Sequence, residues 1–238
     1  MTTDSNTHIE GSTSSQPGTS PIVAGDGQTS RIPPRQQPYT QAIALGFDAL
    51  LRQDLSPERL KTLGVNRISD VIRIPMLNRF LLVDMAKREI TIEGGGTAKH
   101  TWALLALHYL CADDVSVDLR EVSLNHFADS RSYYSVFNKR ILGRFLATTG
   151  RTQERFEQAS ENLDAERISC TGACFRFRIL PRVPLSIIRH EGDDEFEASA
   201  NVIYRADAGT LLPAEDRIVA AEALLDALSG KPMEEGSV

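Results

Sequence analysis

Apolar residues recur along this chain with two different periods, one typical of helices and one typical of strands. Residues 39–51 follow the helical period, with Ile43, Phe47 and Leu50 on one face. A short second helix is expected to begin after Ser56, because serine is a preferred N-cap and Pro57 suits the first helical position. Gly64 is expected to end this helix.

The next segment changes to the strand pattern and then returns to helix. Residues 69–92 contain short apolar runs interrupted by Pro75 and Asn78, and they predict two or three short strands in hairpin order. Residues 97–111 are apolar nearly all round, which indicates a buried central helix with Thr97 or Thr101 as its cap.

The second half of the chain mixes the same elements. Proline is excluded from central strands, so residues 181–184 are expected to form a kink between two strands. Helices are expected at 133–146 (with Phe137, Ile141 and Phe145 on one face), 153–163 and 214–228, and strands at 115–122, 175–180, 185–188 and 198–204. Short antiparallel strands packed by several helices, without long crossover helices, indicate an α+β fold.

The two ends of the chain differ from this patterned region. Residues 1–38 are rich in Ser, Thr, Gly, Gln and Pro and hold few apolar residues, so a disordered N-terminal tail is expected. Residues 39–230 are expected to form a single α+β domain, and residues 231–238 a frayed C-terminus. This organisation also leaves open a scaffold whose tail recruits partners.

The composition narrows the class of protein. The chain of 238 residues has a formal net charge of −6 and no basic stripe with interleaved aromatic residues, which argues against nucleic-acid binding. No apolar run approaches the roughly 20 residues of a membrane-spanning helix, and no signal peptide is readable. Three cysteines do not make a disulfide framework, and Cys170 with Cys174 form at most half a zinc site, so a cytoplasmic location is expected.

Six segments form an ordered set that covers roughly residues 40–228. They are residues 75–83 (PMLNRFLLV), 104–110 (LLALHYL), 133–140 (YYSVFNKR), 180–185 (LPRVPL), 192–196 (GDDEF) and 212–216 (LPAED). Taken together, this set resembles the bacterial and archaeal family catalogued only as domain of unknown function 3786.

The family has no established reaction, so the resemblance implies only the modules and genes with which relatives are associated. Relatives are expected mostly in anaerobes, sometimes joined to iron–sulfur modules or near corrinoid-dependent methyl-transfer genes. An iron–sulfur cluster needs about four closely spaced cysteines, and this chain has three. The resemblance therefore implies a binding or accessory protein for an anionic cofactor or a metallocofactor system, corrinoid- or tetrapyrrole-related, whether a small molecule or a metalloprotein partner.

Arginines mark the preferred candidate binding site. Arg176 and Arg178 alternate with apolar residues of a predicted strand and therefore share one face of it. Together with Arg182 they are expected to hold a carboxylate or phosphate, which guanidinium groups bind in a bidentate way. An exposed sheet face that balances nearby acids explains the same row of arginines equally well.

His108 lies in the apolar helical segment, and a neutral imidazole there is a candidate axial ligand for a tetrapyrrole metal. Tyr133 and Tyr134 are expected to line the same pocket. A core histidine that is hydrogen-bonded to a neighbour is the more ordinary explanation.

Acidic residues suggest a second kind of site. Asp193, Asp194 and Glu195 form an acidic turn, which Glu215 and Asp216 would join if the terminal helix begins nearby. Clustered carboxylates bind Mg²⁺ or Ca²⁺, and a bound metal activates water, so the alternative function is a divalent-metal-dependent hydrolase or transferase. A solvated hairpin turn and acids in the first turn of a helix explain the same residues structurally. The ligand, the reaction and the oligomeric state stay open.

Overall fold

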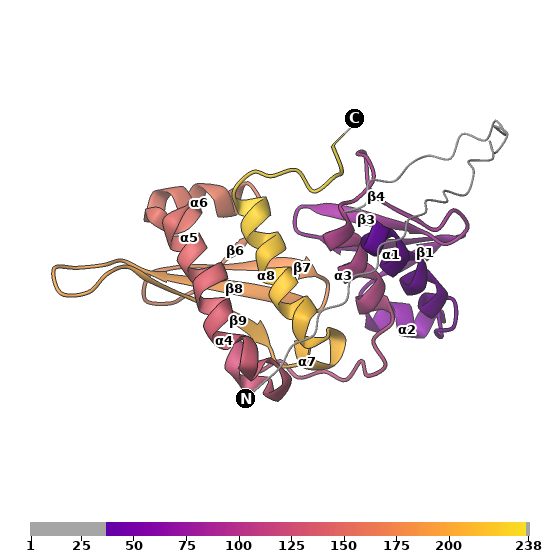
Figure 1. The fold of residues 1–238 in the computed structure, drawn as a ribbon, viewed down its shortest axis with the longest axis horizontal. Coiled ribbons are helices and arrows are strands. Elements are labelled where there is room, and N and C mark those ends of the chain that lie inside the picture. The colour runs from indigo at the N-terminus through magenta and orange to yellow at the C-terminus, as the bar shows by residue number, and fades with distance from the viewer. Residues whose placement is uncertain (1–36, 237–238) are drawn as a thin grey trace, which may run out of the picture. The chain divides into compact units, whose positions relative to one another are not determined.

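The computed structural model describes residues 37–236, and they form two antiparallel sheets with helices packed against them (Figure 1). The α+β class expected from the sequence is therefore confirmed. The expected tail, residues 1–38, lies outside the described residues except for its last two positions, which begin the first helix. Within residues 37–236, no helix has both the length and the apolar character needed to cross a bilayer.

The first part of the described chain builds a four-stranded sheet and three helices. These elements are α1 (Gln37–Leu50), α2 (Pro57–Thr62), β1 (Asn66–Ile68), β2 (Val71–Met76), β3 (Arg79–Asp84), β4 (Glu89–Ile92) and α3 (His100–Leu110). The strand order is β1-β2-β3-β4, and β2 alternates between buried and half-buried positions, with Ile72 and Ile74 fully buried. Helices α1 and α3 pack so closely that a Cβ atom at Gly46 would lie 2.8 Å from Leu107 Cδ1. Only glycine fits there without displacing its neighbour.

The second part builds a five-stranded sheet with the order β5-β9-β8-β7-β6. Its strands are β5 (Glu121–Ser123), β6 (Glu166–Arg167), β7 (Ala173–Leu180), β8 (Val183–His190) and β9 (Ser199–Arg205). Its helices are η1 (Leu124–His126), η2 (Ala128–Tyr133), α4 (Tyr134–Phe137), η3 (Asn138–Gly143), α5 (Arg144–Ala147), η4 (Thr149–Arg151), α6 (Gln153–Glu161), α7 (Ala208–Leu211) and α8 (Ala214–Leu228).

Helices α4, α5, α6 and α8 lie across one face of this second sheet (Figure 1). Phe156 of α6 packs edge-on against Phe175 of β7, with ring centroids 5.2 Å apart, and Phe177 lies on the same buried face. Arg176 and Arg178 point to the opposite face, which the helices leave open. The alternation predicted for this strand is therefore confirmed.

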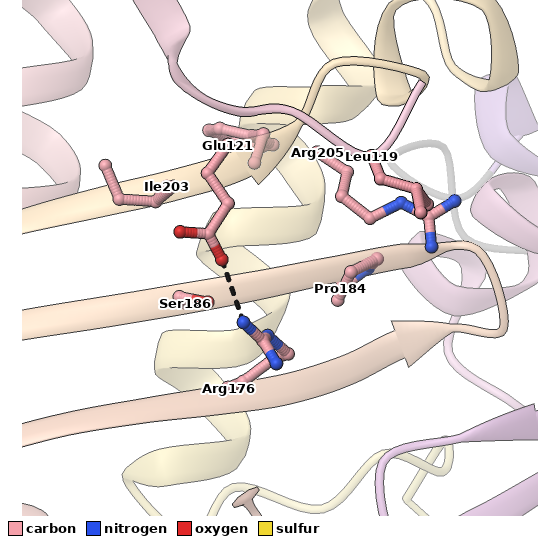
Figure 2. A pocket seen from close by; sticks show the side chains of 8 residues that line it. Leu119, Glu121, Arg176, Pro184, Ser186, Ile203 and Arg205 are labelled. Atoms are coloured by element: carbon pink, nitrogen blue, oxygen red, sulfur yellow. Dashed lines mark hydrogen bonds and ion pairs between the residues drawn. The ribbon is translucent and has the colours of Figure 1, made fainter. Parts of the chain in front are cut away.

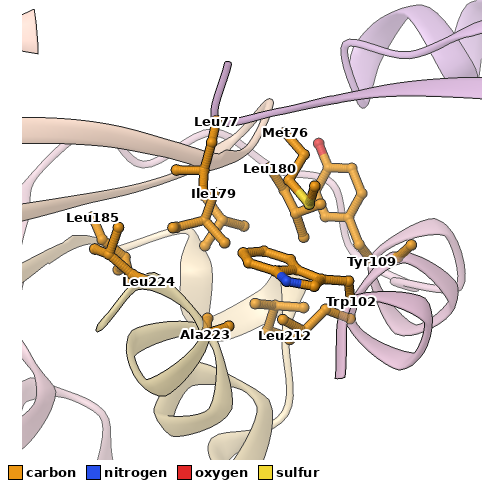
Figure 3. Packing of buried hydrophobic residues seen from close by; sticks show 14 of the residues in the cluster. Met76, Leu77, Trp102, Tyr109, Ile179, Leu180, Leu185, Leu212, Ala223 and Leu224 are labelled. Atoms are coloured by element: carbon orange, nitrogen blue, oxygen red, sulfur yellow. The ribbon is translucent and has the colours of Figure 1, made fainter. Parts of the chain in front are cut away.

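The two sheets meet where the tight turn between β2 and β3 docks on β7. The backbone N–H of Leu77 donates to the carbonyl oxygen of Arg178 at 2.6 Å, next to a shift of the β7–β8 register between Arg178 and Leu180. The side chain of Leu77 is buried beside Ile179 and Leu180 (Figure 3). One apolar core therefore runs from the first sheet to α8, and Figure 3 also labels its members Met76, Trp102, Tyr109, Leu185, Leu212, Ala223 and Leu224.

Several predicted elements match the structure closely. Helix α8 has the predicted bounds, and Ser56 caps α2 by accepting a hydrogen bond from the N–H of Arg59. Phe137, Ile141 and Phe145 are all buried as expected, although residues 138–143 adopt π-helical rather than α-helical hydrogen bonding.

Other predicted details are wrong. Helix α3 begins at His100 after Lys99, so neither Thr97 nor Thr101 is its N-cap. Of the possible strand at 115–122, only residues 121 and 122 lie in a strand, and that strand, β5, extends to Ser123. Pro184 lies inside β8, which is a central strand, and it pairs with β7 beside the register shift. Hydrogen bonding between the two strands is already irregular there, so the strand tolerates a residue that has no N–H to donate.

The end of the described chain is held in place rather than frayed. The N–H of Lys99 donates to the carbonyl oxygen of Met233 at 2.9 Å, and the N–H of Glu235 donates to that of Thr97 at 2.8 Å. Met233 is buried. The segment expected to fray is therefore ordered and packed against the domain at least as far as residue 235.

Candidate functional site

The junction of the two sheets leaves a hollow of about 440 Å³, which we call the junction groove. Its walls come from the β2–β3 turn, the chain before β6, and the β7–β8 hairpin. The lining residues are Pro75, Leu77, Asn78, Arg79, Phe80, Asp164, Glu166, Arg176, Arg178, Pro181 and Pro184. Prolines and a phenylalanine supply apolar walls, and three arginines face two acids.

Two of these arginines already have acidic partners. Arg79 pairs with Glu234 at 2.6 Å, and Arg176 lies between Glu121 at 2.8 Å and Glu166 at 3.2 Å. Partial burial tends to lower the pKa of Arg176, but the hydrogen bonds and charges of the two glutamates outweigh burial and raise it. Arg176 therefore stays charged and is largely neutralised by its neighbours.

Arg178 differs from both. Its side chain is exposed, and among residues 37–236 its guanidinium group makes no hydrogen bond or ion pair. Its backbone carbonyl, by contrast, is fixed by the bond from Leu77. The groove thus presents one uncompensated guanidinium group on a rigid strand, with all of its donors free for an incoming carboxylate or phosphate.

The rim of the junction groove contains two unusual backbone conformations. Leu77 has φ of 47° and Asp164 has φ of 52°, both in the left-handed region that non-glycine residues seldom adopt. Burial of the Leu77 side chain and its hydrogen bond to Arg178 oppose the strain at that position. Ser69 and Arg88 also have positive φ and lie away from the groove, so these conformations accompany the tight turns of the chain and do not by themselves mark the groove as a ligand site.

A second, smaller hollow of about 240 Å³ adjoins the groove on the open face of the sheet (Figure 2). Arg176 and Pro184 line both hollows, so the two lie next to each other. Figure 2 shows Glu121 reaching across the strands to Arg176, with Ser186 beneath the pair. Leu119, Ile203, Tyr204 and Arg205 complete the lining of the smaller hollow.

Arg182 does not take part in this site, so its expected role as an anion contact is wrong. It is buried, and it donates to the carbonyl oxygens of Val115 at 2.6 Å and Ser116 at 2.5 Å. It also pairs with Asp207 at 2.9 Å, a carboxylate that Arg205 shares. Arg182 therefore ties the β7–β8 turn to the loop before β5.

His108 also lies elsewhere. Its Nδ1 is 2.5 Å from Asp216 Oδ2, and this hydrogen bond, opposed by burial, raises the pKa of the imidazole. The pair joins the last turn of α3 to the first turn of α8. An oriented imidazole of this kind is able to exchange a proton, but His108, Tyr133 and Tyr134 line neither of the hollows beside the arginines. The structure thus separates these three residues from the arginine site.

The five acids do not form one site. Asp193 Oδ1 accepts from the N–H groups of Glu195 and Phe196 at 2.9 and 2.8 Å, which folds the loop after β8 on itself. Asp216, in the first turn of α8, is hydrogen-bonded to His108 of α3. Residues 37–236 contain no group of three or more His, Cys, Asp or Glu side chains placed to hold a metal ion. The expected grouping of Asp193, Asp194 and Glu195 with Glu215 and Asp216 is therefore wrong, and a metal-dependent hydrolase or transferase stays a prediction without a site.

The cysteines show one pairing that the sequence did not suggest. Cys170 and Cys174 are joined in a disulfide, with Cα atoms 6.2 Å apart, at the start of β7. Cys111 is free and half-buried, and burial raises the pKa of its thiol. The odd number of cysteines argued against a framework of several disulfides, and it gave no information on whether two of the three cysteines pair.

Sequence reasoning missed Arg79, Asp164 and the proline walls. Residues 75–83 and 180–185, two of the segments that carry the family resemblance, supply most of the lining of the groove. Their membership in that ordered set was the available sequence signal for this site. A sequence gives no direct sign that these segments touch across two sheets.

Comparisons with known proteins give one result that bears on identity. No curated protein and no solved structure matches the chain. A family model does match, over residues 56–227, which is well over half of the 238 residues. The segments that form the junction groove lie within the matched region, and the chain belongs to the family described as Domain of unknown function (DUF3786).

Proposed function

We propose that this chain is a binding protein, rather than an enzyme, whose junction groove holds a carboxylate or phosphate group of a small-molecule cofactor or of a cofactor-carrying partner. The observation that carries the proposal is the exposed guanidinium group of Arg178, which has no partner among the described residues. Arg176 and Arg79 are paired with Glu121, Glu166 and Glu234, so Arg178 is the arginine of the groove that is left for a ligand.

The chemistry of the walls supports a ligand with both apolar and anionic parts. Phe80, Pro75 and Pro181 offer flat, rigid apolar surface at one end of the groove. Small-molecule sites combine mostly apolar walls with a few placed polar groups. The groove is more polar than such a site, because six of its eleven lining residues are polar or charged, and Arg178 is the arginine among them without an ion pair.

The tetrapyrrole and corrinoid part of the expectation fits the described residues less well. A metal ligand and the anion contacts of one cofactor have to share a cavity, and His108 lines neither of the hollows beside the arginines. The proposal therefore rests on anion recognition alone and assigns no metal ligand. It includes a cytoplasmic location, where the reducing environment would keep Cys170 and Cys174 as thiols rather than as the disulfide that the structure shows.

Isothermal titration calorimetry with defined anions tests this proposal. Pyrophosphate and succinate serve as phosphate and carboxylate probes, and Arg178→Ala removes the anchor. Arg155→Ala is the matched control, because Arg155 is exposed on α6 and its side chain forms no hydrogen bond or ion pair within residues 37–236. We expect the wild type and Arg155→Ala to bind the probes with equal affinity. The affinity of Arg178→Ala should be about tenfold lower or more, because the variant loses a charge-assisted bidentate contact. Equal affinity in all three proteins contradicts the proposal.

A further inference from the structure

The loop between β8 and β9, residues 191–198, is an acidic arm that ends in an exposed aromatic side chain. It carries Glu191, Asp193, Asp194, Glu195 and Glu197 and no Lys, Arg or His. Phe196 is 71% exposed. Figure 1 shows the arm projecting beyond the helices that cover the sheet. Exposure alone does not mark Phe196, because Ile68 is equally exposed; what distinguishes Phe196 is its place among five acids at the tip of a projecting hairpin.

The arm is built to present Phe196 outward. The N–H of Asp193 donates to the carbonyl oxygen of Phe196 at 2.9 Å, and the Asp193 carboxylate accepts two N–H groups of the same turn. Gly192 permits this closure, because a Cβ atom there would lie 2.7 Å from the backbone nitrogen of Ala198. Phe196 therefore stays in solvent in the isolated chain.

The same chain offers a surface with complementary chemistry. The junction groove has an uncompensated arginine, Arg178, and apolar walls that include Phe80 and Pro181. The acidic arm has excess negative charge and one large apolar side chain. Opposite charge and matched apolar surface are the ordinary requirements for a specific contact between chains.

We propose that the acidic arm of one copy occupies the junction groove of a second copy, which forms a two-fold symmetric dimer. This inference rests on the proposed function, because it names the groove's anionic partner. Phe196 packs against the proline walls, and the arm's carboxylates face Arg178.

The position of the two features allows the dimer to close. Strand β8 begins at Val183, beside the groove residue Pro184, and ends at His190, beside the arm. Eight residues of strand separate the two features by about 26 Å at roughly 3.3 Å per residue. Two copies whose open sheet faces meet in antiparallel orientation place each arm at the other's groove, so both contacts form at once. A contact made at one end only would propagate into filaments.

Sedimentation velocity on the full chain over a range of protein and salt concentrations tests this arrangement. We expect a dimer whose dissociation constant rises with salt and rises about tenfold or more in Phe196→Ser. Ile68→Ser is the matched control, because Ile68 is also 71% exposed but lies on β1, and it should leave the dimer unchanged. Circular dichroism confirms that both variants are folded.

A charge-swap experiment decides the pairing. Arg178→Glu reverses the charge of the unpaired groove residue, and the triple variant Asp194→Lys, Glu195→Lys and Glu197→Lys changes the formal charge of the arm from −5 to +1 while keeping Asp193, which closes the turn. Each protein alone should be monomeric, and an equimolar mixture should restore a heterodimer, because each arm then meets a groove of opposite charge. A wild type that is monomeric at all concentrations, or a dimer that survives both reversals, overturns the inference.

The outcomes also separate this inference from the proposed function. A monomeric wild type that still binds pyrophosphate or succinate through Arg178 removes the dimer and keeps the anion site. A charge-swap heterodimer in a protein that binds neither probe removes the small-molecule site and keeps the contact between copies.

Discussion

Two sets of arginines on the same sheet have opposite surroundings. Arg182 and Arg205 share the fully buried carboxylate of Asp207, and Arg182 also donates to two backbone carbonyls. Arg178, on β7, is exposed and has no hydrogen-bond or ion-pair partner in the described part of the chain. Residue type alone does not distinguish these positions, whereas burial and hydrogen bonding do.

The comparison separates structural from binding roles. A buried guanidinium group whose donors are met by carboxylate and carbonyl oxygens holds segments together, and little of its charge is available to a ligand. An exposed guanidinium group on a rigid strand contributes little to folding and keeps its donors for a ligand. The predictions that follow test this contrast, from the largest effect on stability to the smallest.

Arg182→Ala should have the largest effect. It leaves Asp207 with one partner and two carbonyls without donors, and loss of a buried ionic partner costs about 3 kcal/mol or more. Urea unfolding monitored by circular dichroism measures the loss. A variant as stable as the wild type would place Arg182 among the binding residues after all.

Leu77→Ala should cost about 2 kcal/mol in the free energy of unfolding, because it removes a buried side chain from the turn that joins the sheets while the unfavourable φ remains. Leu45→Ala is the control, since Leu45 is 59% exposed and its loss should change stability by less than about 0.5 kcal/mol. Equal unfolding midpoints for the two variants would contradict the docking of this turn.

His108→Gln should have a smaller effect that depends on pH. The pKa of His108 is raised in the folded state by Asp216, so the pair stabilises the fold below the unfolded pKa of about 6.5, and this contribution is lost as pH rises through the folded value. The effect should stay below about 1 kcal/mol, because the imidazole is 40% exposed.

Unfolding midpoints measured near pH 5.5 and pH 9 check the sign of this effect. The difference between wild type and His108→Gln should be larger at the lower pH. His126→Gln, at an exposed position that forms no ion pair, is the control. A larger difference at the higher pH would mean that the pair does not stabilise the protonated imidazole.

Arg178→Ala should have the smallest effect on stability, within about 0.5 kcal/mol, because its exposed side chain forms no hydrogen bond or ion pair within the described residues. The same urea titration used for Arg182→Ala measures it. A loss of more than 1–2 kcal/mol would show that Arg178 has a structural role and would remove the contrast between the two sets of arginines.

The sequence predicted what depends on neighbours along the chain. Helical spacing located α8, and alternation placed Arg176 and Arg178 on one face of β7. It failed where distant segments decide the outcome. Arg182 follows β7 by two residues, yet contacts with Val115, Ser116 and Asp207 bury it. Nothing in the local pattern signals those partners.

The candidate site was predictable only in part for the same reason. Two of its three arginine candidates were placed on the correct face, but the groove exists because the β2–β3 turn docks on β7. The acids were grouped by type, and the fold separates the loop after β8 from the start of α8. Composition identifies residues capable of a chemistry, and only the tertiary contacts decide which of them meet.

Native mass spectrometry tests whether Arg178 anchors an anionic ligand. The wild type, Arg178→Ala and Arg155→Ala are each purified without added anions from cells of the natural host under anaerobic conditions. The account predicts a bound mass with carboxylate or phosphate groups on the wild type and on Arg155→Ala, and its loss from Arg178→Ala. A bare wild-type polypeptide, or an adduct retained by Arg178→Ala, would contradict it.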